Sequence, residues 1–377
     1  MQSLRAPRFD PTHQADALRA HLDQHGFAVV SSAVEGAAAM DEFKALFWDF
    51  LESIPGTEVR RADPATWMNK KDWLPSPGNG IISGFGFNHC AFMWRLRLLP
   101  KVRRAFEVVW DDETDLLVSF DGGNCFRPWN NAALQQRLGD EIKEAWATIS
   151  GWWHVDQNPM RPHKQGKQSV QGLVSLTAAT ESTGGLCVIP GSHKHHDAVC
   201  ERSRIAVGGD TGGDFVPILE GDEALANGGA LIVCEAGDLI LWDSRLIHCN
   251  TPAIAAPPQP LPQQEPPGVV ELLRIAGYVC MTPASKATEE VLEKRREAFC
   301  GGFGTSHWPH EFNCRVAPLP GMPENNPNEA SPETRRLVGF DRGGHGGGGC
   351  GGGGGGGSSS SSSSAQRNEE EGRCVVS

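Results

Sequence analysis

The chain has 377 residues, of which 39% are hydrophobic, so it can bury the core of one large or two medium domains and is not a wholly disordered chain. Its 34 Lys and Arg residues are outnumbered by 46 Asp and Glu residues, and the formal net charge of −12 is spread without a basic block, which argues against nucleic-acid binding. No run approaches about 18 apolar residues, and the first residues, MQSLRAPRFDP, lack the apolar core of a signal peptide, so we expect a cytoplasmic protein that is not secreted.

The first part of the chain predicts mainly helices. Residues 11–25 have the pattern of a short helix stopped by Gly26, and FAVV at 27–30 has that of a strand. Residues 35–51 predict an amphipathic helix and residues 101–110 a further one. The run LLVSF at 116–120 predicts a strand that is closed by the turn Asp121-Gly122-Gly123.

Beyond residue 149 the pattern changes to short strands separated by Gly, Pro and Asn. The apolar runs are SVQGLVSL, GLCVIP, ALIVC, GDLILWD and ELLRIAGYVCM. Helices first and many short strands afterwards predict an α+β domain built around an antiparallel barrel or jelly roll.

The C-terminal segment has a different composition. Of the 45 glycines, 13 lie between residues 343 and 357, and seven serines follow at 358–364. Such a chain cannot offset its ordering entropy, so we expect the folded domain to span residues 1–342 and residues 343–377 to form a disordered tail. The last four residues, CVVS, match a C-a-a-X signal, which predicts a farnesylated Cys374 and reversible membrane association, although a disordered end without function fits the same residues.

The histidines contain a candidate metal site, whereas the eleven cysteines lack the C-x-x-C pair of a zinc knuckle. Iron used for oxygen chemistry is commonly held by two His and one carboxylate, and H-x-D on a strand points both side chains to one face. The motif occurs at 21–23 in a predicted helix, at 195–197 in a polar loop, and at 154–156 beside the strand-rich half. We therefore favour His154 and Asp156.

A later strand is expected to supply the third ligand. His248 lies near the end of the apolar run in GDLILWDSRLIHCNTP, 94 residues after His154. This leaves enough chain for the intervening strands of a barrel. Taken alone, His248 would more often be an ordinary hydrogen-bonded histidine, and its context makes it the candidate.

The segments GWWHVDQNP, GGLCVIPGSHK and GDLILWDSRLIHCNTP, in this order and at these distances, resemble the phytanoyl-CoA dioxygenase family of iron(II) and 2-oxoglutarate oxygenases. The resemblance covers residues 15–315. It implies a double-stranded β-helix, a cupin-like jelly-roll core with N-terminal helices packed on it. It also implies that His154, Asp156 and His248 are the catalytic metal ligands for Fe(II), with 2-oxoglutarate and O2 as cosubstrates.

The resemblance further implies an arginine, on the strand after the distal histidine, that pairs with the far carboxylate of 2-oxoglutarate. A Pro-rich insertion, AIAAPPQPLPQQEPPG, follows His248, and the first arginine on a later strand is Arg274. Arg245, in a tight turn before His248, is the competing candidate. Gln171, on the strand after the metal motif, is a candidate to contact 2-oxoglutarate. Asn124 lies beside a Gly-rich turn, where it either lines a cofactor pocket or stabilises the turn.

The expected reaction is hydroxylation of a small organic substrate with release of succinate and CO2. Halogenating relatives replace the metal carboxylate with a small residue, whereas Asp156 is present here. The sequence has no basic cluster to bind the phosphates of an acyl-CoA. Its eleven tryptophans can line an apolar pocket. No protein partner is predicted. Two alternatives remain: a cupin-like metal enzyme that does not use 2-oxoglutarate, and a catalytically silent binding module.

Overall fold

The computed structural model describes residues 1–68, 72–255, 270–313 and 315–342. The helices in these residues are α1 (Ala15–His25), α2 (Ala37–Ser53), α3 (Ala91–Arg97), α4 (Pro100–Val109), α5 (Ala132–Leu138), α6 (Ile142–Trp146), α7 (His196–Val207), α8 (Glu289–Cys300) and α9 (Pro332–Val338). Most of the Pro-rich insertion and the C-terminal segment with Cys374 lie outside the described residues, so the tail and its farnesylation stay predictions.

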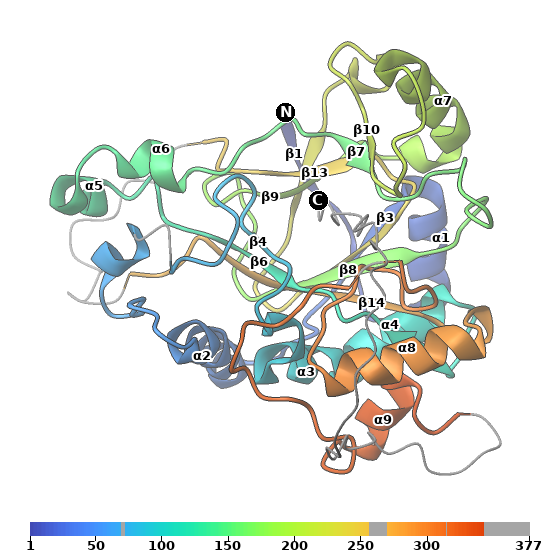
Figure 1. Ribbon diagram of the computed structural model, residues 1–377. Coiled ribbons are helices and arrows are strands. Elements are labelled where there is room, and N and C mark those ends of the chain that lie inside the picture. The colour runs from blue at the N-terminus through green and yellow to red at the C-terminus, as the bar shows by residue number, and fades with distance from the viewer. Residues whose placement is uncertain (69–71, 256–269, 314, 343–377) are drawn as a thin grey trace, which may run out of the picture.

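The strands form two sheets that face each other (Figure 1). Their bounds are β1 (Gln2–Arg5), β2 (Arg8–Phe9), β3 (Phe27–Val30), β4 (Ile81–Ile82), β5 (Leu116–Val118), β6 (Gly123–Phe126), β7 (His154–Val155), β8 (Val170–Ser175), β9 (Gly185–Val188), β10 (Val216–Pro217), β11 (Ala230–Val233), β12 (Leu239–Asp243), β13 (His248–Thr251) and β14 (Arg274–Pro283).

Among the described residues, the smaller sheet has six strands in the order β1-β11-β9-β13-β7-β10. The larger sheet has the order β2-β3-β12-β8-β14-β6-β4, with β5 paired to β14. All pairs are antiparallel except β1 with β11 and β2 with β3. Two facing sheets with such crossovers form a jelly roll, and the predicted α+β class and double-stranded β-helix are confirmed.

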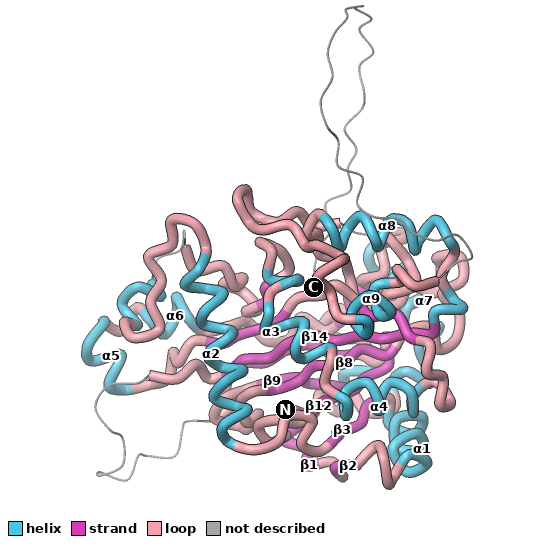
Figure 2. The backbone as a smooth tube through the Cα atoms, turned by 90° about the horizontal axis from the view of Figure 1, so that it is seen from below, coloured by secondary structure: helices cyan, strands magenta, loops and turns pink. Residues whose placement is uncertain are grey.

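The larger sheet has an outer face covered by helices and an inner face that looks toward the smaller sheet. Helices α2, α3, α4, α8 and α9 lie on its outer side (Figures 1 and 2). On β14, Ile275, Val279 and Met281 point into the apolar core shared with these helices. Ala276 and Tyr278 point instead toward the smaller sheet, because successive side chains on a strand point to opposite faces.

The N-terminal elements agree closely with the sequence patterns. Helix α1 ends at Gly26, whose φ of +79° is left-handed and whose N–H donates to the carbonyl of Leu22. A Cβ at Gly26 would also lie 2.5 Å from Nδ1 of His193, so the position has no room for a side chain. The glycine that stops the helix therefore also brings it against the turn that follows β9.

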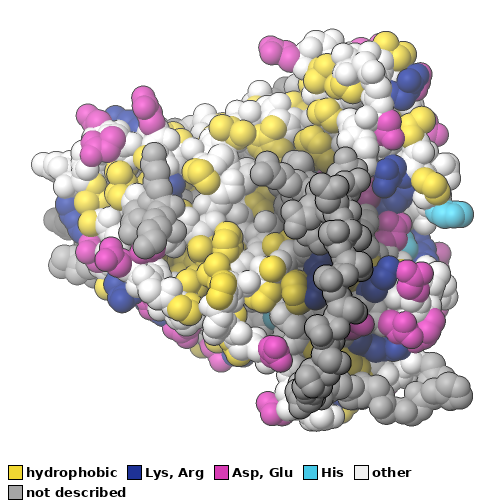
Figure 3. All heavy atoms as spheres, viewed as in Figure 1, with side chains coloured by type: hydrophobic (Ala, Val, Ile, Leu, Met, Phe, Trp, Pro, Cys, Tyr) yellow, Lys and Arg dark blue, Asp and Glu magenta, His cyan; other side chains and the backbone are white. Residues whose placement is uncertain are grey.

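The described helices include none with the length and apolar character to cross a bilayer. Figure 3 shows hydrophobic side chains grouped in the middle of the face seen in Figure 1, with many acidic and basic side chains toward its margins.

Candidate metal centre

Two adjacent strands of the smaller sheet bring the predicted metal ligands together. His154 opens β7 and His248 opens β13, and the two residues are directly paired in the antiparallel register. Asp156 follows β7, and its Oδ1 lies 3.5 Å from Nε2 of His154 while its Oδ2 lies 3.2 Å from Nε2 of His248. One ligand atom from each of the three residues lies within 4.8 Å of the others. This spacing suits a single divalent ion, whose bonds to N and O are about 2.0 to 2.2 Å long.

The backbone fixes the tautomer of both imidazoles. Nδ1 of His154 lies 3.1 Å from the carbonyl oxygen of Trp152, and Nδ1 of His248 lies 2.9 Å from that of Leu246. A carbonyl oxygen only accepts, so each neutral ring carries its proton on Nδ1. Each Nε2 then presents a lone pair to the space between the ligands, as metal-binding histidines require.

Aromatic rings hold the His154 imidazole in place. The Trp152 ring stacks on it with centroids 4.9 Å apart and planes at 10°, and the Phe215 ring lies on its other side at 4.7 Å and 25°. His154 is only 1% exposed. The ring is thus both oriented and shielded from water.

The pKa values of Asp156 and His154 are both lowered, but for different reasons. Burial by itself would raise the pKa of the Asp156 carboxyl, but the neighbouring His154 and His248 outweigh it and hold that pKa well below its usual value. Burial, followed by the nearby His248, lowers the pKa of His154. An ionised carboxylate and a neutral imidazole are the forms that bind a metal.

Gln171 supports the carboxylate of the cluster. It lies on the inner face of β8, and its Nε2 donates a 2.8 Å hydrogen bond to Oδ2 of Asp156. A ring nitrogen of His307 lies 3.3 Å from the backbone carbonyl of the same aspartate. Gln171 therefore orients a metal-binding group, and its predicted contact with 2-oxoglutarate stays a prediction.

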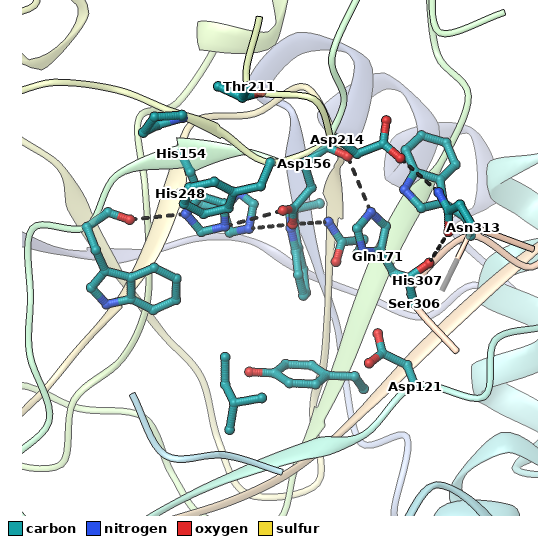
Figure 4. Close-up of a pocket in the computed structure, with 18 of the residues that line it drawn as sticks. Asp121, His154, Asp156, Gln171, Thr211, Asp214, His248, Ser306, His307 and Asn313 are labelled. Carbon is teal, nitrogen blue, oxygen red and sulfur yellow. Dashed lines mark hydrogen bonds and ion pairs between the residues drawn. The ribbon is translucent and has the colours of Figure 1, made fainter. Parts of the chain in front are cut away.

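The three candidate ligands open onto a cavity of about 560 Å³ between the sheets (Figure 4). This volume is typical of small-molecule sites. The walls combine aromatic and apolar side chains with a few polar groups: Ile81, Asp121, Trp152, Arg161, Gln171, Leu186, Thr211, Asp214, Phe215, Pro217, Trp242, Asn250, Tyr278, Ser306, His307, Trp308 and Asn313. The sequence analysis identified only Gln171 among these wall residues.

Arg274 begins β14 and is a buried cation with little neutralisation. It is 3% exposed, its Nη1 donates a 2.9 Å hydrogen bond to Oδ1 of Asn250, and its guanidinium lies 5.1 Å from the Phe126 ring centroid. No carboxylate in the described part of the chain forms an ion pair with it, and burial lowers its pKa. Its neighbour Asn250 lines the cavity, so the guanidinium lies beside that space.

Arg245, the competing candidate, is already paired. Its Nε and Nη2 donate to the two carboxylate oxygens of Asp243 at 2.9 and 2.7 Å. Neither arginine is itself part of the cavity wall, but Arg274 donates to Asn250, which is. The two arginines thus differ in the property that matters for anchoring a ligand carboxylate, since only Arg274 lacks an acidic partner among the described residues.

Asn124 lies on β6, where its Nδ2 donates a 2.8 Å hydrogen bond to the backbone carbonyl of Asn79. Its Oδ1 is buried and accepts no hydrogen bond from the described residues. The side chain is not part of the cavity wall, and its hydrogen bond to Asn79 links β6 to the segment before β4. Its role in cofactor binding stays a prediction.

The other sequence motifs have structural roles. The H-x-D pair at 21–23 lies in α1, and the pair at 195–197 lies in helical turns rather than in the expected loop. The described residues place neither pair in a metal cluster. In the P-G-S-H turn, Ser192 Oγ accepts a 2.9 Å hydrogen bond from the N–H of Ile247, beside the metal ligand His248. The turn thus braces the start of β13.

Residues 122–252 match the model of the phytanoyl-CoA dioxygenase (PhyH) family. The predicted family resemblance is confirmed. The matched residues include His154, Asp156, Gln171 and His248, whereas Arg274 lies beyond them. A curated protein, "Ava biosynthesis cluster protein O" from Aspergillus versicolor, is 27% identical over 262 residues, which cover 67% of this chain and 74% of that protein.

Solved structures give weaker likenesses. The nogalamycin-biosynthesis carbocyclase SnoK, described as non-heme and alpha-ketoglutarate dependent, is 12% identical, covers 74% of this chain and 88% of its own, and gives a TM-score of 0.45. EctD from S. alaskensis, with 2-oxoglutarate and 5-hydroxyectoine, is 16% identical, covers 75% of this chain and 84% of its own, and gives 0.42.

Proposed function

We propose that this protein is an Fe(II)- and 2-oxoglutarate-dependent oxygenase that hydroxylates a small organic substrate. The observation that carries the proposal is the placement of a two-His-one-carboxylate cluster and a buried arginine without an acidic partner on the facing sheets of one jelly roll. Arg97 and Arg295 are also buried without an ion pair in the described residues, but each donates to two or more backbone carbonyls, whereas the Arg274 side chain donates one hydrogen bond, to Asn250. A buried guanidinium with so few partners beside a cavity favours an anionic ligand.

The residues present fit an iron ion, since His154 Nε2, His248 Nε2 and the Asp156 carboxylate converge on one point while their other polar atoms are already bonded. Iron(II) with bound 2-oxoglutarate would supply the oxygen chemistry that couples decarboxylation to succinate with oxidation of a C–H bond. His154, Asp156 and His248 would hold the ion in the cavity wall, where the cosubstrate and the substrate would have room beside it.

Arg274 would hold the far carboxylate of 2-oxoglutarate. Its planar fork can pair with a carboxylate through two parallel hydrogen bonds, and burial strengthens such a pair. The hydrogen bond from Nη1 to Asn250 fixes one edge of the guanidinium and leaves the other nitrogens for the ligand. This assignment explains why an arginine is kept at 3% exposure without an ion pair among the described residues.

The cavity walls would bind the substrate and exclude water. Trp152 and Phe215 already enclose His154, and Trp242 lies 5.5 Å from His248, between ring centroids. Aromatic walls of this kind favour a compact organic molecule over a polymer. The curated relative is named for a biosynthesis cluster, which agrees with a small-molecule substrate.

The test is to incubate full-length protein with iron(II), 2-oxoglutarate and air, with and without candidate substrates, and to measure succinate and product mass. We expect succinate in proportion to a product that is heavier by one oxygen atom. Iron binding without any effect of 2-oxoglutarate would favour a cupin-like enzyme of another kind. Failure to bind either would favour a silent binding module, and succinate with an isomerised or cyclised product would overturn hydroxylation alone.

A further inference from the structure

Asp121 is a carboxylate of the cavity wall that the proposed oxygen chemistry does not use. It lies in the turn between β5 and β6, and its Oδ1 accepts a 2.7 Å hydrogen bond from the N–H of Gly122. Within the described part of the chain no side chain donates a hydrogen bond to its carboxylate or forms an ion pair with it. Figure 4 shows this carboxylate directed into the space below His307.

The backbone around Asp121 is rigidly held. Its carbonyl oxygen accepts a 2.9 Å hydrogen bond from Nη2 of the fully buried Arg97. A Cβ on the following Gly122 would lie 1.7 Å from the carbonyl oxygen of Ile82, so only glycine fits there. The carboxylate is therefore presented from a fixed position, as a recognition group requires.

The other carboxylates of the wall are already engaged. Asp156 is bonded to Gln171 and lies against the two histidines. Asp214 pairs with the buried ammonium of Lys164 at 3.2 Å and accepts a 3.0 Å hydrogen bond from Asn313. Asp214 also keeps a buried oxygen, Oδ1, without a hydrogen bond, but its charge is balanced by Lys164. Among the wall carboxylates in the described residues, Asp121 is thus the one that forms no ion pair, and its Oδ2 accepts no side-chain hydrogen bond there.

The charged side chains that line the cavity indicate which ligand group could pair with the carboxylate of Asp121. Three aspartates line the cavity, and the cationic side chain of the described wall is Arg161, which donates to the carbonyl of Gly212. Burial raises the pKa of the Asp121 carboxyl, and a cation bound beside it would offset that cost. Aromatic rings in the remaining wall attract a cation as well.

We propose that Asp121 determines substrate specificity by receiving a protonated amine on a compact, largely aromatic or aliphatic substrate. This inference rests on the proposed function, because it names the substrate class of the same cavity. An acyl-CoA or another polyanionic substrate would bring its negative groups against three aspartates and is disfavoured.

The test uses three probes of similar shape: phenethylamine, 2-phenylethanol and 3-phenylpropanoate. Each is titrated by calorimetry into full-length protein, with iron(II) and 2-oxoglutarate under anaerobic conditions and again without them. We expect the amine to bind at least tenfold more tightly than the alcohol, and the carboxylate to bind most weakly. Asp121→Asn, which still accepts the Gly122 hydrogen bond, should weaken amine binding at least tenfold and change alcohol binding less than twofold.

Asp140→Asn makes the same chemical change at a side chain that is 85% exposed, and it should leave all three affinities unchanged. The proposal would be overturned if the three probes bind equally, if the carboxylate binds more tightly than the amine, or if the amine does not bind. It would also be overturned if Asp121→Asn keeps full affinity for the amine. If Asp121→Asn does not fold, the three probes on the unaltered protein decide. Succinate release without amine preference would overturn this inference alone, and amine preference without succinate release would overturn the oxygenase proposal alone.

Discussion

The two faces of β14 have different surroundings: one looks toward the cavity between the sheets, and the other packs into the apolar core. Arg274 and Tyr278 point toward the cavity between the sheets, whereas Val279 and Met281 point into the apolar core beneath the helices. The inner face contains a cation without an acidic partner among the described residues, and the outer face is packed with side chains of 0% exposure. Function and stability are thus separated by a single step along the strand, so substitutions on the two faces should have separable effects.

The largest effect is expected at the candidate metal ligands on β7 and β13, which face β14 across the cavity. His154→Ala and His248→Ala should each remove succinate release, because two ligands cannot hold the ion in place of three. Both variants should keep the unfolding midpoint close to that of the unaltered apo protein. The measurement is iron content per chain together with succinate release. A variant that retains both iron and full activity would remove that histidine from the centre.

The next effect concerns the outer face. Met281→Ala leaves a cavity in the core beneath the helices and should lower the free energy of unfolding by about 3 kcal/mol. The 2-oxoglutarate requirement of the folded variant should stay unchanged. Urea unfolding and a 2-oxoglutarate titration measure the two quantities. A changed requirement with unchanged stability would show that the two faces are not separable in this way.

On the inner face of the same strand, Arg274→Gln should raise the 2-oxoglutarate concentration needed for half-maximal succinate release by about thirtyfold. This corresponds to the loss of about 2 kcal/mol from a charge-assisted hydrogen bond. The substrate requirement should change much less. The matched variant Arg245→Gln breaks only the pair with Asp243 and should leave the requirement unchanged. The reverse result for the two arginines would move the anchor to Arg245.

The smallest effect is expected at Gln171, which contacts the candidate ligand Asp156. Gln171→Leu removes the hydrogen bond to Asp156 and should weaken iron binding about tenfold while the chain stays folded. Gln168→Leu alters a half-buried amide two residues before the same strand, which bonds to Gln165 and Lys286 and not to Asp156, and serves as the control. Equal iron affinity in the two variants would leave Gln171 without a positioning role and would favour its predicted contact with 2-oxoglutarate.

Local patterns predicted the N-terminal elements and several strands, but not α3 or α5 to α9. The stop of α1 at Gly26 and the H-x-D pair at 154–156 depend on residues close in sequence. The choice of His248 depended on its strand context and on the family resemblance, because it lies 94 residues after His154. The position of Tyr278 on the cavity side of β14 could have been predicted from strand alternation, because it lies four residues after Arg274 and therefore on the same face.

The cavity walls could not be predicted in this way. Thr211 and His307 come from loops nearly a hundred residues apart, and no periodicity marks either segment. Asp121 has the ordinary pattern of a turn residue, and its position over the cavity depends on Arg97 and Ile82 from other elements. Gln171 was placed on a strand, as it is in β8, but only the fold shows that its amide donates to Asp156.

The most direct test of the central claim is an anaerobic titration of 2-oxoglutarate into the iron(II)-loaded protein, followed by the charge-transfer absorption that forms when the keto acid chelates the metal. The account predicts that the band appears in the unaltered protein, is lost in His248→Ala, and requires about thirtyfold more 2-oxoglutarate in Arg274→Gln. Absence of the band from the unaltered, iron-loaded protein would contradict it.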